Sequence, residues 1–213
     1  MNRFALSTLL AGAVLVATPA MAQTFTLDFE GAEGYVNPIL DFYNGGTDSL
    51  GQSGPNLGVS FSEGAVALSN DELGPYFSNA PTPMTVMFAL DDMAVMNVPV
   101  GFTGGLTFQY SSSVGVLDAV QIYSGLNGTG TLLASASLFG NASIGCTDTA
   151  FCRFDLTSVK FAGVAQSVSF GGGNPNVLFD DITVTAVPEP GTYALLAAGL
   201  GVIGLLVRRR RQV

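Results

Sequence analysis

The sequence has 213 residues, enough for one domain with its own core; 48% are hydrophobic and only 11% charged, a balance typical of exported β-rich proteins. It contains no histidine and no tryptophan, so Ser-His-Asp and Cys-His catalysis and histidine-ligated metals are excluded. Sixteen acidic residues against seven basic ones give a net charge of −9, and because nucleic-acid binding requires phosphate neutralisation, nucleic acid is excluded as a partner.

The first 22 residues have the pattern of a secretory signal peptide. Arg3 precedes the apolar run FALSTLLAGAVLVA, and Ala20 and Ala22 occupy the small positions of an A-x-A cleavage site. We therefore expect residues 1–22 to be removed and the mature chain to begin at Gln23. The alternative is an uncleaved anchor helix, for which the apolar run is short.

Residues 23–186 contain short runs in which apolar and polar residues alternate, separated by clusters of Gly, Asn, Pro and Ser. In the first run, TFTLDFE at 24–30, every second residue is apolar, as a half-buried strand requires. About ten runs and no amphipathic helix predict an all-β fold, an antiparallel β-sandwich of jelly-roll type with its first and last strands side by side. The other nine runs are GVSFS at 58–62, AVALS at 65–69, TVMFAL at 85–90, GLTFQYSSS at 105–113, LDAVQIYSG at 117–125, TLLASASLF at 131–139, SVKFAGV at 158–164, QSVSFGG at 166–172 and NVLFDDITVTA at 176–186.

Acidic residues lie at both ends of this predicted domain. Asp28 and Glu30 lie on one face of the first run, and Asp180 and Asp181 lie in the last run. If these strands are neighbours, the carboxylates converge, and hard oxygen ligands without histidine suit Ca²⁺. The sequence thus predicts a structural calcium ion joining the terminal strands; the alternative is that these acids face solvent. The end motifs, FE and DD before an apolar residue, resemble those of the calcium-stapled jelly-roll sandwiches of carbohydrate-binding modules and galactose-binding-like domains.

The two cysteines, Cys146 and Cys152, have five residues between them in the segment CTDTAFC. In an exported chain such a pair forms a local disulfide more often than a reactive site, because the compartment is oxidising. A metal site is the weaker interpretation, since two thiols without histidine fall short of the usual four ligands. We expect a disulfide between them.

Catalysis without histidine would need a pair of carboxylates, as in glycosidases, and Asp91 and Asp92 add to the acids already named. Paired acids are common on protein surfaces, so we expect the protein not to be an enzyme. Sugar binding would instead need exposed aromatic platforms. The candidates for glycan contact are Tyr35, Tyr43 and Tyr76, which lie in loop-like stretches. The alternative is that these side chains pack in the core or against the loops.

The C-terminal segment 187–213 has three parts. Val187 is followed by Pro188, Glu189 and Pro190, which keep the backbone extended because proline fixes its own φ and disfavours helix before it. Residues 191–207 carry no charge and, as a helix of about 25 Å, predict one transmembrane span. The positive-inside rule then places the body outside and the final basic cluster in the cytoplasm. That cluster is Arg208, Arg209, Arg210 and Arg211.

This order of Pro-Glu-Pro, short apolar span and arginine cluster at the end of the chain resembles the PEP-CTERM sorting signal of Gram-negative bacteria. The resemblance implies that an exosortase recognises Pro188, Glu189 and Pro190 and removes the hydrophobic tail. It also implies a protein held in the inner membrane before processing and then released to the cell surface or extracellular matrix, in bacteria that make exopolysaccharide. We predict a non-enzymatic surface or biofilm-matrix protein; the alternatives are a carbohydrate-binding module with a defined glycan and, third, a carboxylate-pair glycosidase.

Overall fold

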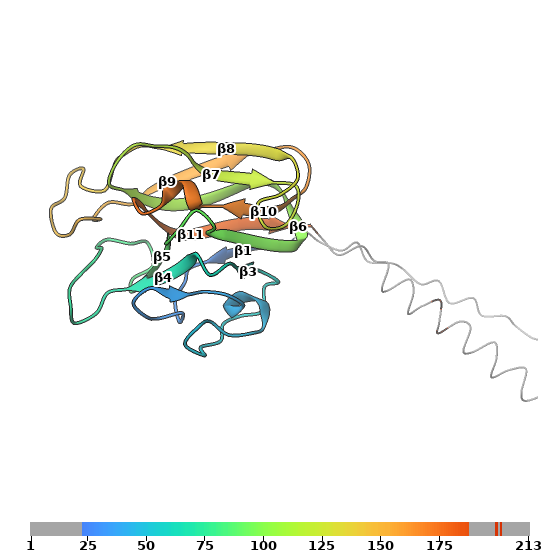
Figure 1. Cartoon of the computed structure of the whole chain (residues 1–213), viewed down its shortest axis with the longest axis horizontal. Helices are drawn as coiled ribbons and strands as arrows, with labels where there is room; N and C mark the ends of the chain where they lie inside the picture. Colours follow the sequence, from blue (N-terminus) through green and yellow to red (C-terminus); the bar gives the residue numbers. More distant parts are fainter. Residues whose placement is uncertain (1–22, 188–198, 200, 202–213) are drawn as a thin grey trace, which may run out of the picture. The chain divides into compact units, whose positions relative to one another are not determined.

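The computed structural model describes residues 23–187 together with Gly199 and Gly201 (Figure 1). The described residues 23–187 lie within one compact unit. The predicted signal peptide at 1–22, the Pro-Glu-Pro segment, the arginine cluster and all but two residues of the predicted transmembrane helix lie outside the described residues. Among the residues that are described, no helix has the length and apolar character needed to cross a membrane.

The body is all-β, as predicted, and its strands are joined in antiparallel pairs. The eleven strands of residues 23–187 are β1 (Gln23–Leu27), β2 (Asn37–Pro38), β3 (Ser60–Phe61), β4 (Ala65–Ser69), β5 (Thr85–Ala89), β6 (Val95–Ser112), β7 (Val116–Tyr123), β8 (Leu132–Leu138), β9 (Asp155–Lys160), β10 (Ala165–Ser169) and β11 (Val177–Ala186). Two short 3₁₀ turns, η1 (Phe42–Asn44) and η2 (Gly171–Gly173), complete the elements.

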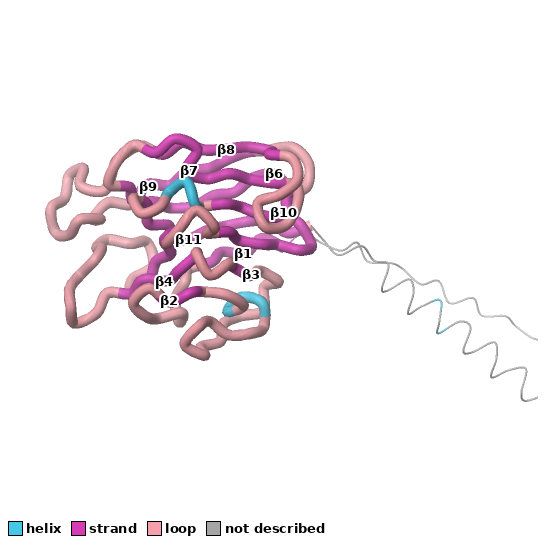
Figure 2. Tube along the Cα trace, viewed as in Figure 1, coloured by secondary structure: helices cyan, strands magenta, loops and turns pink. Residues whose placement is uncertain are grey.

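The long strand β6, labelled among the other strands in Figure 2, connects the two halves of the strand order. Its first part pairs with β3 and β10, and its second part pairs with β9 and β11. From β11 the order continues through β5 and β4 to β2, and from β10 it continues through β7 to β8. The sequence predicts a strand only from residue 105, because Pro99, Gly101 and Gly104 are strand breakers. In the structure the two glycines take left-handed φ values of 83° and 81°, so the strand bends there and continues.

The first and last strands are neighbours, which confirms the predicted pairing. β1 pairs antiparallel with β11 over its whole length, from Gln23 opposite Ala186 to Leu27 opposite Ile182. Alternation along both strands sends Leu27, Ile182 and Val184 into the core between the layers. Phenylalanine rings fill much of this core, and edge-to-face pairs such as Phe170 with Phe179, whose ring centroids are 4.9 Å apart, add about 0.5–1.5 kcal/mol each beyond their burial.

A second, smaller apolar cluster covers the outer face of β4, β5 and β11. Its buried members are Leu68, Phe77, Val86 and Leu178. Because the inward residues of the same strands, such as Met87 and Phe179, belong to the main core, these strands are apolar on both faces. The loops that cover the outer face therefore have an apolar surface to pack against.

Candidate functional site: an aromatic hollow between two loops

Two long loops cross the outer face of β4, β5 and β11. One joins β4 to β5 (residues 70–84) and the other joins β8 to β9 (residues 139–154). They meet at Phe77 and Phe151, which form a parallel bridge, and the backbone N–H of Ser78 donates to the carbonyl of Phe151 at 2.9 Å. The two loops are thus joined to each other as well as to the sheet.

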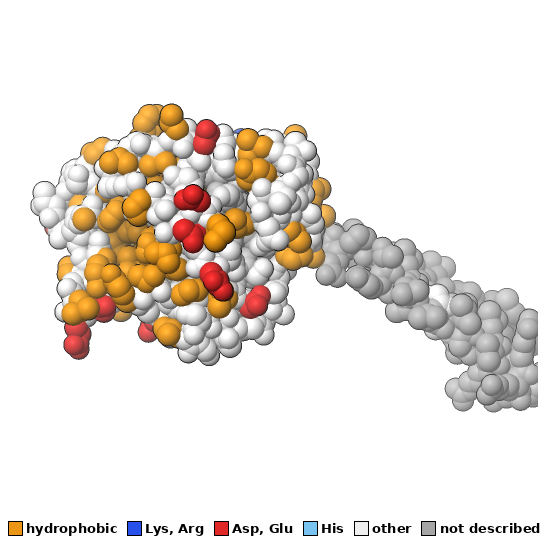
Figure 3. Space-filling view, in the orientation of Figure 1, with side chains coloured by type: hydrophobic (Ala, Val, Ile, Leu, Met, Phe, Trp, Pro, Cys, Tyr) orange, Lys and Arg blue, Asp and Glu red, His pale blue; other side chains and the backbone are white. Residues whose placement is uncertain are grey.

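Between these loops lies a hollow of about 380 Å³, which we call the aromatic hollow. On the face seen in Figure 3, apolar side chains gather over the part of the body where Figure 1 labels β4 and β5, with acidic side chains near them. The concave shape and the apolar lining with few polar groups are typical of small-ligand sites. The lining residues are Leu68, Pro75, Tyr76, Phe88, Ala150, Phe151, Pro175 and Leu178.

Two of the predicted glycan-contact residues meet at the rim of this hollow. The rings of Tyr35 and Tyr76 lie 5.3 Å apart between centroids, with a tilt of 42°. Tyr35 is 63% exposed, and the hydroxyl of Tyr76 donates a hydrogen bond to Oδ1 of Asp71 at 3.1 Å. The rim therefore combines aromatic faces with a carboxylate acceptor, the two kinds of group that contact a sugar ring and its hydroxyls.

Tyr43, the third candidate for glycan contact, is a core residue, so that prediction is wrong for this side chain. It is 1% exposed, and its hydroxyl oxygen accepts a hydrogen bond from the backbone N–H of Phe29 at 2.7 Å. The same hydroxyl donates to Asp28 Oδ1 at 3.4 Å, and burial raises the pKa of Tyr43 well above its usual value. Its position before a glycine pair suggests a loop, but the chain there forms the buried turn η1.

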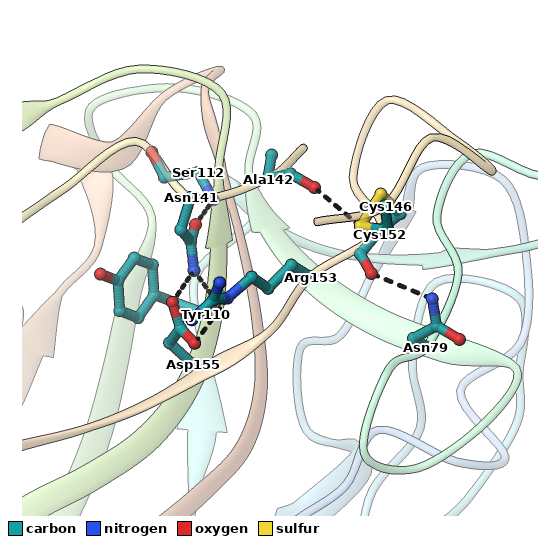
Figure 4. A network of polar contacts seen from close by, with 9 residues as sticks. All are labelled: Asn79, Tyr110, Ser112, Asn141, Ala142, Cys146, Cys152, Arg153 and Asp155. Carbon is teal, nitrogen blue, oxygen red and sulfur yellow. Dashed lines mark hydrogen bonds and ion pairs between the residues drawn. A yellow bond between two sulfur atoms is a disulfide. The ribbon is translucent and has the colours of Figure 1, made fainter. Parts of the chain in front are cut away.

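The predicted disulfide is present and holds the second loop. Cys146 and Cys152 are joined by an S–S bond of 2.05 Å (Figure 4). Asn79, from the first loop, donates its amide N–H to the carbonyl of Cys152 at 3.0 Å. The disulfide thus closes the loop that carries Phe151 and fixes the residue beside it.

A buried asparagine anchors the same loop to β6 (Figure 4). Asn141 is 3% exposed; its Oδ1 accepts from the backbone N–H of Ser112 at 2.7 Å, and its Nδ2 donates to the carbonyl of Tyr110 at 3.1 Å. Nδ2 also donates to Oδ2 of Asp155 at 2.9 Å, while Arg153 Nε pairs with Oδ1 at 3.0 Å. The hydrogen bond from Asn141, and after it Arg153, hold the pKa of Asp155 below its usual value. Sequence reasoning missed this network, since a loop asparagine carries no signal of burial.

The acids at the ends of the domain have separate intrachain partners. Asp180 is fully buried; its carboxylate accepts from the backbone N–H of Thr82 at 3.2 Å and from Oγ1 of Thr82 at 3.0 and 3.1 Å. Burial raises the pKa of Asp180 to about 7. Oε1 of Glu30 accepts from the backbone N–H of Thr85 at 2.9 Å, and burial raises the pKa of Glu30 as well.

Asp28 and Asp181 lie near Asp180. Burial raises the pKa of Asp181, and the negative charge of Asp28 raises it further. The Thr82 hydroxyl also lies 3.3 Å from the carbonyl oxygen of Asp28. Across residues 23–187, no three acidic or thiol side chains form a group that could hold a metal ion. A calcium ion here would therefore rely on backbone carbonyl oxygens beside one or two carboxylates.

Comparison with known proteins identifies the C-terminal segment. Residues 186–211 match the sequence profile described as the PEP-CTERM protein-sorting motif, which confirms the predicted sorting signal and begins where β11 ends. The motif implies export, anchoring in the membrane and processing by an exosortase. No curated protein sequence matches the chain.

Two solved structures are similar to the body. The K2 cleaved adhesin domain of Lys-gingipain (Kgp) has a TM-score of 0.43 and 15% identity, and the match covers 77% of this chain and 98% of that one. The isomalto-dextranase of Arthrobacter globiformis T6, complexed with panose, has a TM-score of 0.35 and 12% identity over 78% of this chain. This chain spans 33% of that enzyme's length. At these scores neither likeness bears on function.

Proposed function

We propose that this protein is a non-catalytic surface protein whose β-sandwich body contacts exopolysaccharide after an exosortase has processed its tail. The observation that carries the proposal is the sorting motif at 186–211, which directly follows the last strand of the body. A motif in this place delivers the whole sandwich to the outside of the cell.

The chemistry of the body supports a non-catalytic role. The chain has no histidine, and its two cysteines are joined to each other. Asp180 and Glu30, two of the acids at the ends of the domain, accept hydrogen bonds from Thr82 and Thr85. These bonds hold the end of the loop at 70–84 to β11 and the start of β5 to the turn that follows β1, which is a structural use.

Replacing Pro188, Glu189 and Pro190 together by alanine tests the sorting step. We expect the variant to stay membrane-bound with its full C-terminal mass, because the exosortase no longer recognises it. The unchanged chain should lose that mass and appear in the surface fraction, measured by intact-mass spectrometry of each fraction. A variant processed like the unchanged chain would contradict the proposal, and Gln212→Ala is the matched control.

The second candidate function is a carbohydrate-binding module with a defined glycan, and the paired rings of Tyr35 and Tyr76 favour it. We expect glycan-array binding to fall when both tyrosines are replaced by alanine. Phe139→Ala is the control, since Phe139 is 81% exposed and does not line the hollow. Equal binding by all three proteins would contradict this candidate.

We further propose a structural calcium ion between the terminal strands, near the Asp28 carbonyl and the Asp180 and Asp181 carboxylates. Support comes from the buried Asp180 carboxylate, which forms no ion pair among the described residues and would gain a counter-charge. Thermal unfolding in the presence of about 1 mM calcium and in the presence of excess EDTA tests for this ion. We expect a higher melting temperature with calcium; an unchanged midpoint after chelation would remove the proposal.

A further inference from the structure

The outer face of β1, β11, β6 and β9 carries rows of hydroxyl side chains. In β1 and in β11 a threonine occupies every second position, in the segments TFT at 24–26 and TVT at 183–185. The strand register aligns them into one row of three and one row of four across neighbouring strands. We call these seven residues the hydroxyl face: Thr24, Thr185 and Thr103 in the first row, and Thr26, Thr183, Thr107 and Ser158 in the second.

Six of the seven hydroxyls of this face are paired with one another. Oγ1 atoms are 2.9 Å apart between Thr24 and Thr185 and 2.7 Å apart between Thr26 and Thr183. Thr107 Oγ1 and Ser158 Oγ are 3.3 Å apart. A hydroxyl has one donor and two acceptor positions, so each member of a pair keeps capacity for a further bond. Thr183 keeps only an acceptor position, because its Oγ1 also donates to the carbonyl of Asp181 at 3.4 Å. Strand geometry spaces neighbouring groups by about 4.8 Å between strands and by about 7 Å along β1 and β11, whereas Thr103 and Thr107 of β6 are four residues apart across a register shift.

A shallow groove of about 250 Å³ runs through the hydroxyl face. Gly104 and Gly105 form part of its lining between Thr103 and Thr107, where side chains are missing. A Cβ atom on Gly105 would lie 3.0 Å from the carbonyl oxygen of Val159, and Gly104 has a φ of +81°, so both positions favour glycine. The groove therefore has backbone at its base and hydroxyls along its sides.

The charge of the groove narrows the kind of partner. Its lining contains no carboxylate, and Lys160 is its one cation. Of the two cations in residues 23–187, Arg153 pairs with Asp155, whereas Lys160 has no ion pair within that range. One cation in the groove, on a protein with a net charge of −9, does not suit nucleic acid or an anionic membrane surface. The lining residues that the structure describes include no aromatic side chain, so a sugar here would be held by hydrogen bonds and not by stacking on aromatic platforms.

We propose that the hydroxyl face binds an extended polysaccharide strand along the groove, with its sugar hydroxyls bonded to Thr107, Thr183 and Ser158. Sugar hydroxyls both donate and accept, as do the groups of this face, and Lys160 supplies a donor to a sugar oxygen or to a uronate carboxylate. This inference rests on the proposed contact with exopolysaccharide and assigns it to a surface other than the aromatic hollow. The hydroxyl face becomes visible only in the strand register, which aligns residues from four strands into two rows.

The test is co-sedimentation of the full-length chain, purified in detergent, with a neutral β-glucan and with a uronate polymer. Thr107→Val with Thr183→Val removes two hydroxyls while keeping the shape and strand preference of the side chains. We expect this double variant to bind at least tenfold more weakly with an unchanged melting temperature. Thr131→Val, on an exposed loop residue, is the matched control and should bind like the original chain.

A second variant, Lys160→Gln, distinguishes the two polymers. If Lys160→Gln loses binding to the uronate polymer alone, Lys160 contacts the uronate carboxylate. If it loses binding to both polymers equally, Lys160 contacts a sugar hydroxyl. Both outcomes place the polymer on the hydroxyl face and support the proposal. Unchanged binding by the double threonine variant overturns the proposal. Binding that is lost only in the variant with Tyr35→Ala and Tyr76→Ala also overturns it, and so does an original chain that binds neither polymer. Tail processing is read separately by mass, so failure of sorting and failure of this surface are distinguishable.

Discussion

Replacing Asn141 by alanine should lower the free energy of unfolding of the body by about 2 kcal/mol. The change leaves the buried backbone N–H of Ser112 without its acceptor and removes one bond to the carbonyl of Tyr110, which lies opposite Asp155 in the β6–β9 ladder. A buried polar group that loses its partner costs about 1–3 kcal/mol. The bond to Asp155 adds little, because that side chain is 36% exposed and its interaction is screened. The expected loss is a large fraction of the 5–15 kcal/mol typical of a domain.

The variant should also respond less to acid. In the original chain the folded-state pKa of Asp155 is lowered, first by Asn141, so the folded carboxylate stays ionised where the unfolded one is protonated. Its stabilising effect is present above the unfolded pKa, near 4, and is lost as the pH falls through the lower folded pKa. Asn141→Ala removes the main cause, so the slope of stability against pH below about 4 should become shallower.

Urea unfolding followed by far-UV circular dichroism measures both effects, since the chain has no tryptophan. Asn141→Asp is a second variant that keeps an acceptor for Ser112 but places a carboxylate against Asp155. It should be less stable than Asn141→Ala at pH 7 and recover part of the difference below pH 4. Asn56→Ala, at an exposed loop position, is the control. A loss under about 1 kcal/mol for Asn141→Ala would refute the reasoning, because unsatisfied buried groups cannot be that inexpensive.

Two further predictions concern the disulfide of the second loop and the buried Tyr43. Replacing Cys146 and Cys152 by alanine should lower the free energy of unfolding by about 2 kcal/mol, a modest loss because the disulfide closes only a short loop. Thermal unfolding measures the change. A melting temperature equal to that of the original chain would show that the contacts of Asn79 and Asn141 hold the loop without the disulfide. Tyr43→Phe should cost about 1–3 kcal/mol in urea unfolding, since the buried N–H of Phe29 loses its acceptor, whereas Tyr35→Phe should be neutral; equal effects of the two would contradict the assignment of Tyr43 to the core.

The strands with regular alternation are those that the sequence predicts well. The pairing of β1 with β11 follows from two strongly patterned terminal strands, and the disulfide follows from the spacing of Cys146 and Cys152. The extent of β6 does not follow, because Pro99 and Gly101 look like strand breakers until a bend is allowed for. The residues around Pro99 favour a turn locally. The bend that replaces the turn depends on the strands, distant in sequence, that pair with the two parts of β6.

The two candidate surfaces depend on contacts between distant segments. Tyr35 and Tyr76 come together only because separate loops fold over one face of the sheet. Tyr43 has the same local surroundings of turn residues, yet its ring packs between Phe29 and Phe42. Exposure of an aromatic residue is therefore set by which neighbour covers it, which sequence pattern alone does not state.

The pair Asp180 and Asp181 has a structural explanation in the register of β11. Before this pair the odd-numbered Phe179 faces the core and Leu178 faces outward, whereas after it the even-numbered Ile182 and Val184 face the core. The register of β11 against β6 shifts between Asp180 and Thr183. Asp181 takes a left-handed φ of 49°, and its N–H donates to Oδ1 of Asp180 at 2.8 Å.

This shift decides which residues of β11 reach the surface. Unbroken alternation from Phe179 would send Thr183 and Thr185 into the core, where an unpaired hydroxyl costs about 1–3 kcal/mol. Aspartate suits the position because a short polar side chain tolerates left-handed backbone and bonds to it locally. One irregularity in β11 thus gives the strand an apolar outer side under the aromatic hollow and a hydroxyl outer side beyond Asp181. The DD pair that suggests calcium ligands is, whether or not an ion binds there, what brings Thr183 and Thr185 to the hydroxyl face.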